Sequence, residues 1–149
     1  MQLNQLFSHW DQIHKDTLAT LDKFSEAELN YVAYAGSMSV GEIALHMAHA
    51  EEGWFRLIVT QERYEWPDDY TLQKYPTKSA IKTLLRQVHA KTMAYLGTLT
   101  LADLEREVVS HWGSFSLRFI IWHVLEHEIH HRGELSLILG TLGRPGLDV

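Results

Sequence analysis

The chain has 149 residues, of which 46% are hydrophobic and 21% charged, values typical of a globular protein rather than a disordered segment. Its net charge of −6 and the lack of any Lys or Arg run argue against nucleic acid as the main partner. The absence of cysteine excludes disulfides, thiolate ligands and a cysteine nucleophile. With no secretory signal and no apolar run long enough for a membrane span, we expect a soluble, cytoplasmic protein with one domain over residues 1–149.

The first half of the chain predicts two long helices. Apolar residues recur at spacings of three and four over residues 3–21, which indicates one amphipathic helix. The segment SEAE at 25–28 has the form of a capping box and predicts a short helical turn after it. Ser39 and Glu42 repeat that pattern at the start of a second helix, whose apolar positions continue to Ile58.

The middle of the chain predicts a loop followed by a third helix. The stretch QERYEWPDDYTLQKYP at 61–76 contains two prolines and no sustained period, so it is expected to be a loop. Thr77 then caps a helix whose apolar positions continue to Leu99. The segment TLADLE at 100–105 predicts one more short capped turn.

A fourth helix closes the pattern. It is expected to begin near Ser114 or Ser116 and to end at Gly140 or Gly143, since glycine commonly terminates a helix. We find no alternating strand pattern of any length. Four long amphipathic segments in one small domain therefore predict an all-α fold, a four-helix bundle.

The fourth predicted helix is unusually rich in histidine, in the stretch HVLEHEIHHRGEL at 123–135. A buried imidazole is unfavourable unless both ring nitrogens find partners. His127 and His131 lie one helical turn apart and face the same way, the spacing by which a helix presents two imidazoles to one metal ion. Apolar residues flank this stripe, so we expect it inside or at the mouth of the bundle.

The second helix offers further imidazoles in the stretch LHMAHAEE, which contains His46 and His49. One imidazole from this helix and two from the fourth would make a three-nitrogen site with coordination positions left open, as in catalytic metal sites. From the residues alone a second interpretation stays open. The bundle would hold no metal, and its histidines would pair with Glu126, Glu128 and Glu134.

The two histidine-bearing blocks, SVGEIALHMAHAEEGWF and HVLEHEIHHRGELSLILGTLG, resemble the DinB/YfiT-like family of metal-binding four-helix-bundle proteins. The resemblance covers essentially the whole chain. It implies an up-down-down-up bundle, a homodimer, and three histidines around a divalent ion, usually nickel or zinc. Matched block to block, the metal ligands fall on His46, His127 and His131. Glu134 stands where the family often has Gln or another residue, so it is a candidate fourth ligand or base.

Other polar residues near these blocks are assigned lesser roles. Glu51 is the best candidate for a carboxylate that orients a metal-bound imidazole, and Glu51 and Glu134 are the weak candidates for a catalytic role. His49 and His123 are interpreted as neighbours of the site rather than ligands. The remaining expectations are a His130–Glu126 pair, an Arg132–Glu128 pair, and structural or exposed positions for His9, His14, His89 and His111.

The resemblance also suggests a chemistry. An ion held by three neutral imidazoles can lower the pKa of a bound water or thiol. Because the wider superfamily includes thiol-dependent transferases and isomerases, the expected function is thiol S-transfer to an unknown small molecule, and hydrolysis is the close competitor. The alternative is a stress-related bundle that binds metal or ligand without catalysis. A binding protein could close the open coordination position with Glu134 or His123.

Overall fold

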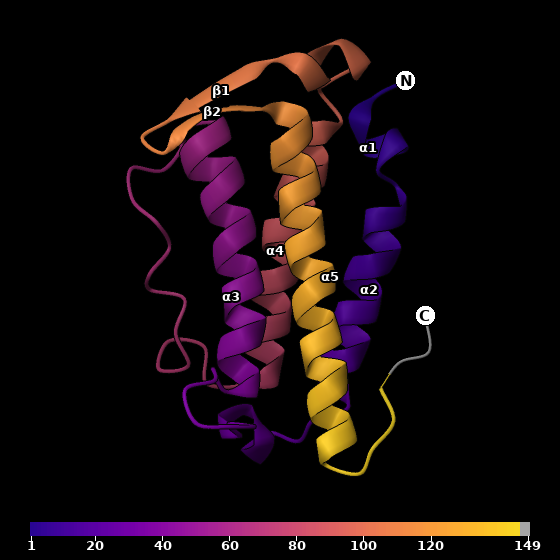
Figure 1. Ribbon diagram of the computed structural model, residues 1–149, viewed down its shortest axis with the longest axis vertical. Coiled ribbons are helices and arrows are strands. Elements are labelled where there is room, and N and C mark those ends of the chain that lie inside the picture. Colours follow the sequence, from indigo (N-terminus) through magenta and orange to yellow (C-terminus); the bar gives the residue numbers. More distant parts are fainter. Residues whose placement is uncertain (147–149) are drawn as a thin grey trace.

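The computed structural model describes residues 1–146, in which four long helices form a bundle (Figure 1). In chain order the elements are α1 (Leu3–Leu6), α2 (His9–Asp22), the 3-10 helix η1 (Ala27–Asn30), α3 (Val40–Glu52), the π-helix η2 (Gly53–Val59), α4 (Lys78–Leu96), the 3-10 helix η3 (Leu101–Glu105), β1 (Glu107–Ser110), β2 (Gly113–Ser116) and α5 (Leu117–Thr141). The α3 and α4 helices run in the same direction because the loop between them returns along the bundle (Figure 1). The topology is therefore up-down-down-up, as predicted. None of these helices is long and apolar enough to cross a membrane.

The starts of the long helices follow the capping residues read from the sequence. The Ser39 hydroxyl accepts a hydrogen bond from the Glu42 backbone N–H at 3.3 Å, and the Glu42 carboxylate accepts one from the Ser39 N–H at 2.7 Å. The Thr77 hydroxyl accepts a hydrogen bond from the Ala80 backbone N–H at the start of α4. At the start of α5 the capping residue is Ser116 rather than Ser114. Each cap satisfies an N–H group that the helix itself leaves without a partner, which fixes the start.

Two features depart from the predicted elements. The predicted first helix is interrupted between Leu6 and His9, so that it forms α1 and α2. The short α1 is held to the segment after α4 by a hydrogen bond of 2.9 Å from the Leu3 backbone N–H to the Leu99 carbonyl. The expectation of no strands was wrong, because β1 and β2 form an antiparallel hairpin that pairs Val108 with Phe115. Each strand has only four residues. That length is too short to produce a recognisable alternation in sequence.

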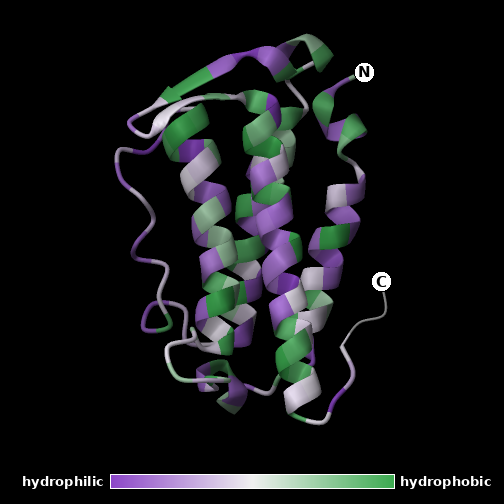
Figure 2. Ribbon diagram, in the orientation of Figure 1, coloured by the Kyte–Doolittle hydropathy of each residue, from purple (hydrophilic) through white to green (hydrophobic). Residues whose placement is uncertain are grey.

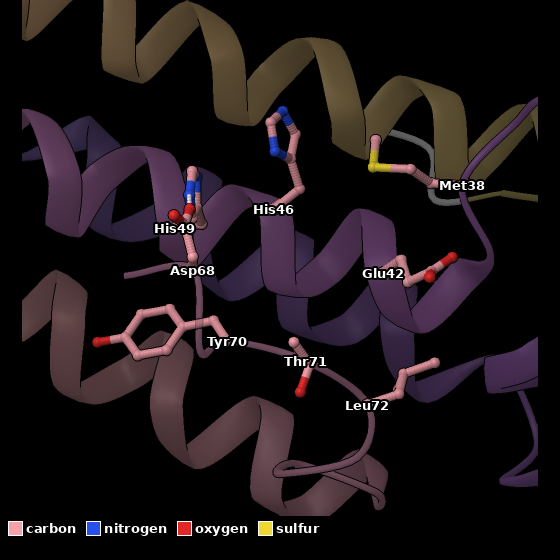
Figure 3. Close-up of a pocket in the computed structure, with 8 residues that line it drawn as sticks. All are labelled: Met38, Glu42, His46, His49, Asp68, Tyr70, Thr71 and Leu72. Carbon is pink, nitrogen blue, oxygen red and sulfur yellow. Dashed lines mark hydrogen bonds and ion pairs between the residues drawn. The ribbon is translucent and has the colours of Figure 1, made fainter. Parts of the chain in front are cut away.

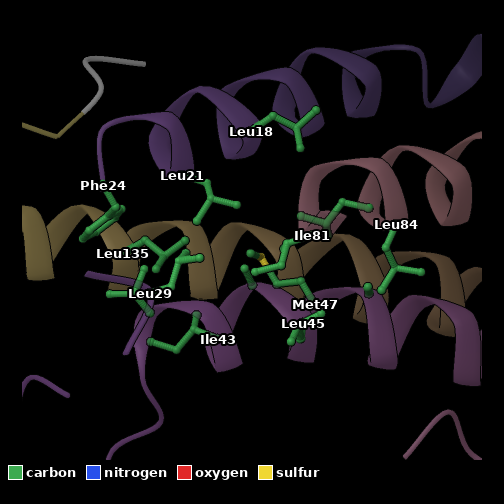
Figure 4. Packing of buried hydrophobic residues seen from close by; sticks show 14 of the residues in the cluster. Leu18, Leu21, Phe24, Leu29, Ile43, Leu45, Met47, Ile81, Leu84 and Leu135 are labelled. Carbon is green, nitrogen blue, oxygen red and sulfur yellow. The ribbon is translucent and has the colours of Figure 1, made fainter. Parts of the chain in front are cut away.

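The core consists of two apolar clusters stacked along the bundle. One lies at the end of the bundle near η1 and contains Leu21, Ile43, Ile81 and Leu135 (Figure 4). The other lies towards the hairpin and includes Trp10, whose side chain is 1% exposed. The middle of α5 is hydrophilic, with hydrophobic stretches on either side (Figure 2). Polar side chains thus occupy the level between the two clusters.

Gly53, the first residue of η2, allows the long loop before α4 to pack on the π-helix. A Cβ atom built at Gly53 would lie 1.7 Å from the ring of Trp66, so the indole rests directly on the backbone of the π-helix. The same indole stacks on His49 with ring centroids 5.4 Å apart. Gly133 in α5 differs, because a Cβ there would meet no atom within 4 Å.

We predict opposite effects of alanine at these two glycines. Gly53→Ala is expected to destabilise the protein by about 1–3 kcal/mol, because the new methyl group displaces Trp66. Gly133→Ala is expected to stabilise it by about 0.5–1 kcal/mol, since alanine restricts the unfolded chain and meets no obstacle in α5. Urea unfolding of both variants checks this. Equal effects of the two substitutions would contradict the placement of Trp66.

Candidate metal centre

The structure brings His46, His127 and His131 together across the contact between α3 and α5. These two helices pack side by side (Figure 1). The ring of His46 lies with its centroid 4.7 Å from that of His127 and 4.9 Å from that of His131. His131 is buried at 8% exposure, whereas His46 and His127 are half-buried. One nitrogen from each of the three rings can be chosen so that all lie within 4.8 Å of one another. The spacing of the two blocks therefore predicted a real cluster.

The distance between the two nearest nitrogens suits a shared ion. Nε2 of His46 and Nε2 of His127 lie 3.0 Å apart. With metal–nitrogen bonds of about 2.0–2.1 Å, two adjacent ligand nitrogens lie about 2.9–3.4 Å apart. The two rings can therefore face a common point between the helices without a change in backbone.

Glu134 contacts the third histidine. Its Oε2 atom lies 2.8 Å from Nδ1 of His131. An ionised carboxylate can only accept, so Nδ1–H of His131 donates and Nε2 keeps its lone pair. A carboxylate that holds a metal-binding imidazole in one tautomer is the usual arrangement around such ligands. This contact gives Glu134 an orienting position, which the sequence had offered instead to Glu51.

The environment keeps two of the three imidazoles neutral. Burial lowers the pKa of His46, and the neighbouring His131 and His49 lower it further. Burial, together with His131 and His46, lowers the pKa of His127 to about 3. Both rings are therefore unprotonated at neutral pH. Since only a neutral imidazole has a lone pair for a metal, the cluster is prepared to bind a cation.

A pocket of about 270 Å³ opens beside His46 (Figure 3). Its wall is formed by α3 and by the loop between η2 and α4, which contributes Asp68, Tyr70 and Thr71 (Figure 3). Nε2 of His49, one helical turn from His46, lies 3.1 Å from Oδ1 of Asp68. No sequence pattern singled out Asp68, because its approach to His49 depends on the path of the loop.

His123 lies outside the three-histidine cluster. Its ring stacks on Phe119 with centroids 5.5 Å apart and meets the edge of Trp54 at 5.1 Å. The pocket that it lines with Glu126, His127 and His130 is a separate hollow of about 190 Å³. Aromatic packing therefore accounts for His123, in agreement with its interpretation as a neighbour of the site.

A second cluster was missed in the sequence. His14 and His89 were interpreted as isolated, but their rings stack with centroids 4.2 Å apart in the bundle core. Nδ1 of His14 lies 2.9 Å from Oε1 of Glu128, and the Trp10 indole N–H donates to the other oxygen at 2.7 Å. The signal was present, because His14 and Glu128 both occupy positions of the apolar stripes of their helices.

This cluster also corrects two expected pairings. Glu51 does not orient a histidine of the three-histidine cluster, because its Oε1 atom lies 3.2 Å from Nδ1 of His89 instead. Arg132 does not pair with Glu128, since its nearest carboxylate is Asp16 at 3.7 Å. In both cases a partner on another helix takes the place of the expected one.

The contacts of His89 change its titration. Burial alone would lower its pKa, but the hydrogen bond with Glu51 and the charges of Glu51 and Glu128 raise it to about 9. Asp11 also contacts His89 at Nε2, at 3.1 Å. Both ring nitrogens therefore donate to carboxylates, and His89 is a buried imidazolium at neutral pH.

We predict that this imidazolium makes stability depend on pH in the metal-free protein. A raised pKa in the folded state stabilises fully below the unfolded value of 6.5, and the effect is lost as pH rises through about 9. The shift corresponds to a loss of about 3 kcal/mol. Urea unfolding at the two pH values should show this loss in the wild type and a smaller one in His89→Gln, which cannot titrate. An equal loss in both proteins would assign the effect to other groups.

Comparison with known proteins identifies the family of this chain. A model of the DinB family matches residues 1–148. The uncharacterised protein YjoA of Bacillus subtilis (strain 168) is 27% identical over 149 residues, which cover 98% of this chain and 94% of that protein.

Three solved structures share the fold. The crystal structure of DinB-like YjoA from Bacillus subtilis has a TM-score of 0.75 at 23% identity, covering 97% of this chain and 96% of that one. A DinB-like protein from Bacillus cereus ATCC 10987 has a TM-score of 0.78 at 19% identity, covering 99% and 97%. YfiT from Bacillus subtilis, described as a probable metal-dependent hydrolase with an unusual four-helix bundle topology, has a TM-score of 0.61 at 23% identity, covering 89% and 87%. Since the family model spans almost the whole chain, this chain belongs to the DinB family.

Proposed function

We propose that His46, His127 and His131 hold one divalent cation, nickel or zinc, and that the chain is a metal-dependent hydrolase acting on a small molecule. The observation that carries this proposal is the 3.0 Å separation of Nε2 of His46 and Nε2 of His127, with His131 beside them. The fold similarity to YfiT, described as a probable metal-dependent hydrolase, supports it.

The three side chains fit such an ion by their chemistry. Imidazole suits nickel and zinc alike, and three nitrogens leave further coordination positions for water or substrate. When bound, the ion would supply Lewis acidity, which polarises a substrate oxygen and makes a nucleophile available at neutral pH. Glu134 holds the His131 ring in the tautomer that points a lone pair away from the carboxylate.

The pocket beside His46 supplies a place for the substrate and a group for proton transfer. His49 and Asp68 both line it, and their contact of 3.1 Å makes an imidazole–carboxylate pair. In such a pair the carboxylate orients the ring. We therefore assign His49 as the candidate general base and Asp68 as the residue that positions it.

Hydrolysis is preferred over thiol S-transfer, the competing reaction, because the fold is similar to that of YfiT, which is described as a probable metal-dependent hydrolase. Both reactions would use the same Lewis acid and an anionic nucleophile, either a hydroxide or a thiolate. A homodimer, which the family resemblance implies, stays a prediction.

We predict that metal content depends on the α5 histidines of the cluster. The tag-free wild type is expected to retain close to one nickel or zinc ion at this site, and the His127→Ala, His131→Ala double variant is expected to lose it. His123→Ala is the matched control, because it removes an imidazole from the same helix outside the cluster. Elemental analysis by mass spectrometry gives the stoichiometry.

Two results would count against this assignment. If the double variant keeps the ion of this site, other residues bind it. If the folded wild type takes up neither nickel nor zinc, the cluster is structural and the hydrolase proposal falls with it. Circular dichroism of each variant shows whether the helices remain folded.

We further predict that His49→Gln lowers the rate of metal-dependent ester hydrolysis, assayed with p-nitrophenyl acetate, by about 100-fold, since general base catalysis contributes about 10²–10⁴. Metal content should stay unchanged, because His49 lies outside the three-histidine cluster. Asp68→Asn should give a smaller loss. Full activity in His49→Gln, with metal bound, would exclude His49 from the reaction.

A further inference from the structure

A layer of ionisable side chains crosses the bundle between its two apolar clusters. Each long helix contributes one member, namely His14 from α2, Glu51 from α3, His89 from α4 and Glu128 from α5. All four are 4–5% exposed. Polar and charged groups buried this deeply are usually hydrogen-bonded, paired or bound to a metal. The proposed hydrolase site uses none of them.

The donor atoms of three of these residues lie close enough to share one ion. A nitrogen of His14, a nitrogen of His89 and a carboxylate oxygen of Glu128 lie within 4.8 Å of one another. The two rings are stacked with centroids 4.2 Å apart, so binding one ion between them would require at least one ring to rotate about its Cβ–Cγ bond. Each oxygen of Glu128 accepts one hydrogen bond and keeps a second lone pair.

In the part of the chain that the structure describes, one nitrogen of the layer is left without a hydrogen-bond partner. Nε2 of His14 is fully buried and has no hydrogen-bond partner within residues 1–146. Because Nδ1 of His14 is already engaged with the Glu128 carboxylate at 2.9 Å, Nε2 is the ring nitrogen left for a further ligand. Leaving such a group buried and unsatisfied is unfavourable, and a metal ion would satisfy it.

The charges of the layer favour a cation as well. Glu51 and Glu128 are buried carboxylates, held by hydrogen bonds with His89 in the first case and with His14 and Trp10 in the second. The imidazolium of His89 balances only one of them. The Asp11 carboxylate, with a side chain 53% exposed, adds negative charge and connects His89 to solvent.

We propose that His14, His89 and Glu128 bind a second divalent cation in the bundle core, with Glu51 beside it. Two imidazoles and a carboxylate form a mixed nitrogen and oxygen donor set, which suits Zn²⁺ or Fe²⁺ better than Mg²⁺ or Ca²⁺. On binding, the ion takes the place of one proton on His89, and that proton leaves to solvent past Asp11. The deep burial of all three donors assigns the ion a structural role.

The test is a zinc titration of metal-free, full-length, tag-free protein, followed by calorimetry and by elemental analysis after removal of free ion. The wild type is expected to bind two ions, and the His127→Ala, His131→Ala variant to bind one. His14→Gln is expected to reduce the wild-type number from two to one, because glutamine can still donate to Glu128 but is a poor metal ligand. His9→Gln, at the start of the same helix, is the matched control and should bind two.

The outcomes separate this proposal from the hydrolase proposal. One ion in the wild type that is lost only in His14→Gln supports the core site and removes the three-histidine site. One ion that is lost only in the His127→Ala, His131→Ala variant, with no change in His14→Gln, overturns the core site. Zinc should also raise the Tm of the double variant, and His14→Gln in that background should abolish the rise. An unchanged Tm in the folded double variant overturns the proposal as well.

Discussion

The hydrogen bonds of Glu128 are the interaction on which the rest of the structure depends. A carboxylate buried in the middle of a bundle is strongly unfavourable unless both oxygens are satisfied. Here both are, by His14 and Trp10 of α2. These two contacts hold α5 at one rotation about its axis. Because neighbouring residues on a helix point about 100° apart, the rotation that directs Glu128 to α2 also directs His127 and His131 towards α3.

The hydrogen bonds of this polar layer therefore hold in place the helices that carry the candidate metal ligands. The α3 helix is tied to the same layer by Glu51, which contacts His89 of α4. The helices that carry His46, His127 and His131 are thus each fixed by a buried hydrogen bond roughly one turn from their imidazoles. Residues that are held this way need little rearrangement when they bind a ligand, which is the basis of preorganisation. The apolar clusters above and below supply the stability that this layer does not.

Sequence patterns predicted the parts of this protein that depend on local chemistry. Helix starts at Ser39 and Thr77 follow from hydrogen bonds within one turn, so three or four residues are enough to recognise them. His127 and His131 were readable for the same reason. The contact between His49 and Asp68 was not, because it depends on the path of the 18-residue loop between η2 and α4. The hairpin was missed because each strand has too few residues to show a period.

The core cluster of His14, Glu51, His89 and Glu128 was missed for a different reason. Its members occupy core positions on four separate helices, and each alone is an ordinary polar interruption of an apolar stripe. What the sequence does contain is the coincidence that every long helix has such an interruption at a similar level. Some neighbouring helices of the bundle are parallel and others antiparallel. Which polar residues lie at the same height along the bundle can therefore be recognised only after the up-down-down-up order is known. The fold thus has to be assigned before the buried charges can be matched. In the three-histidine cluster, the pair His127 and His131 can be recognised from helical spacing, whereas the choice of His46 as its partner came from the resemblance to the DinB/YfiT-like family.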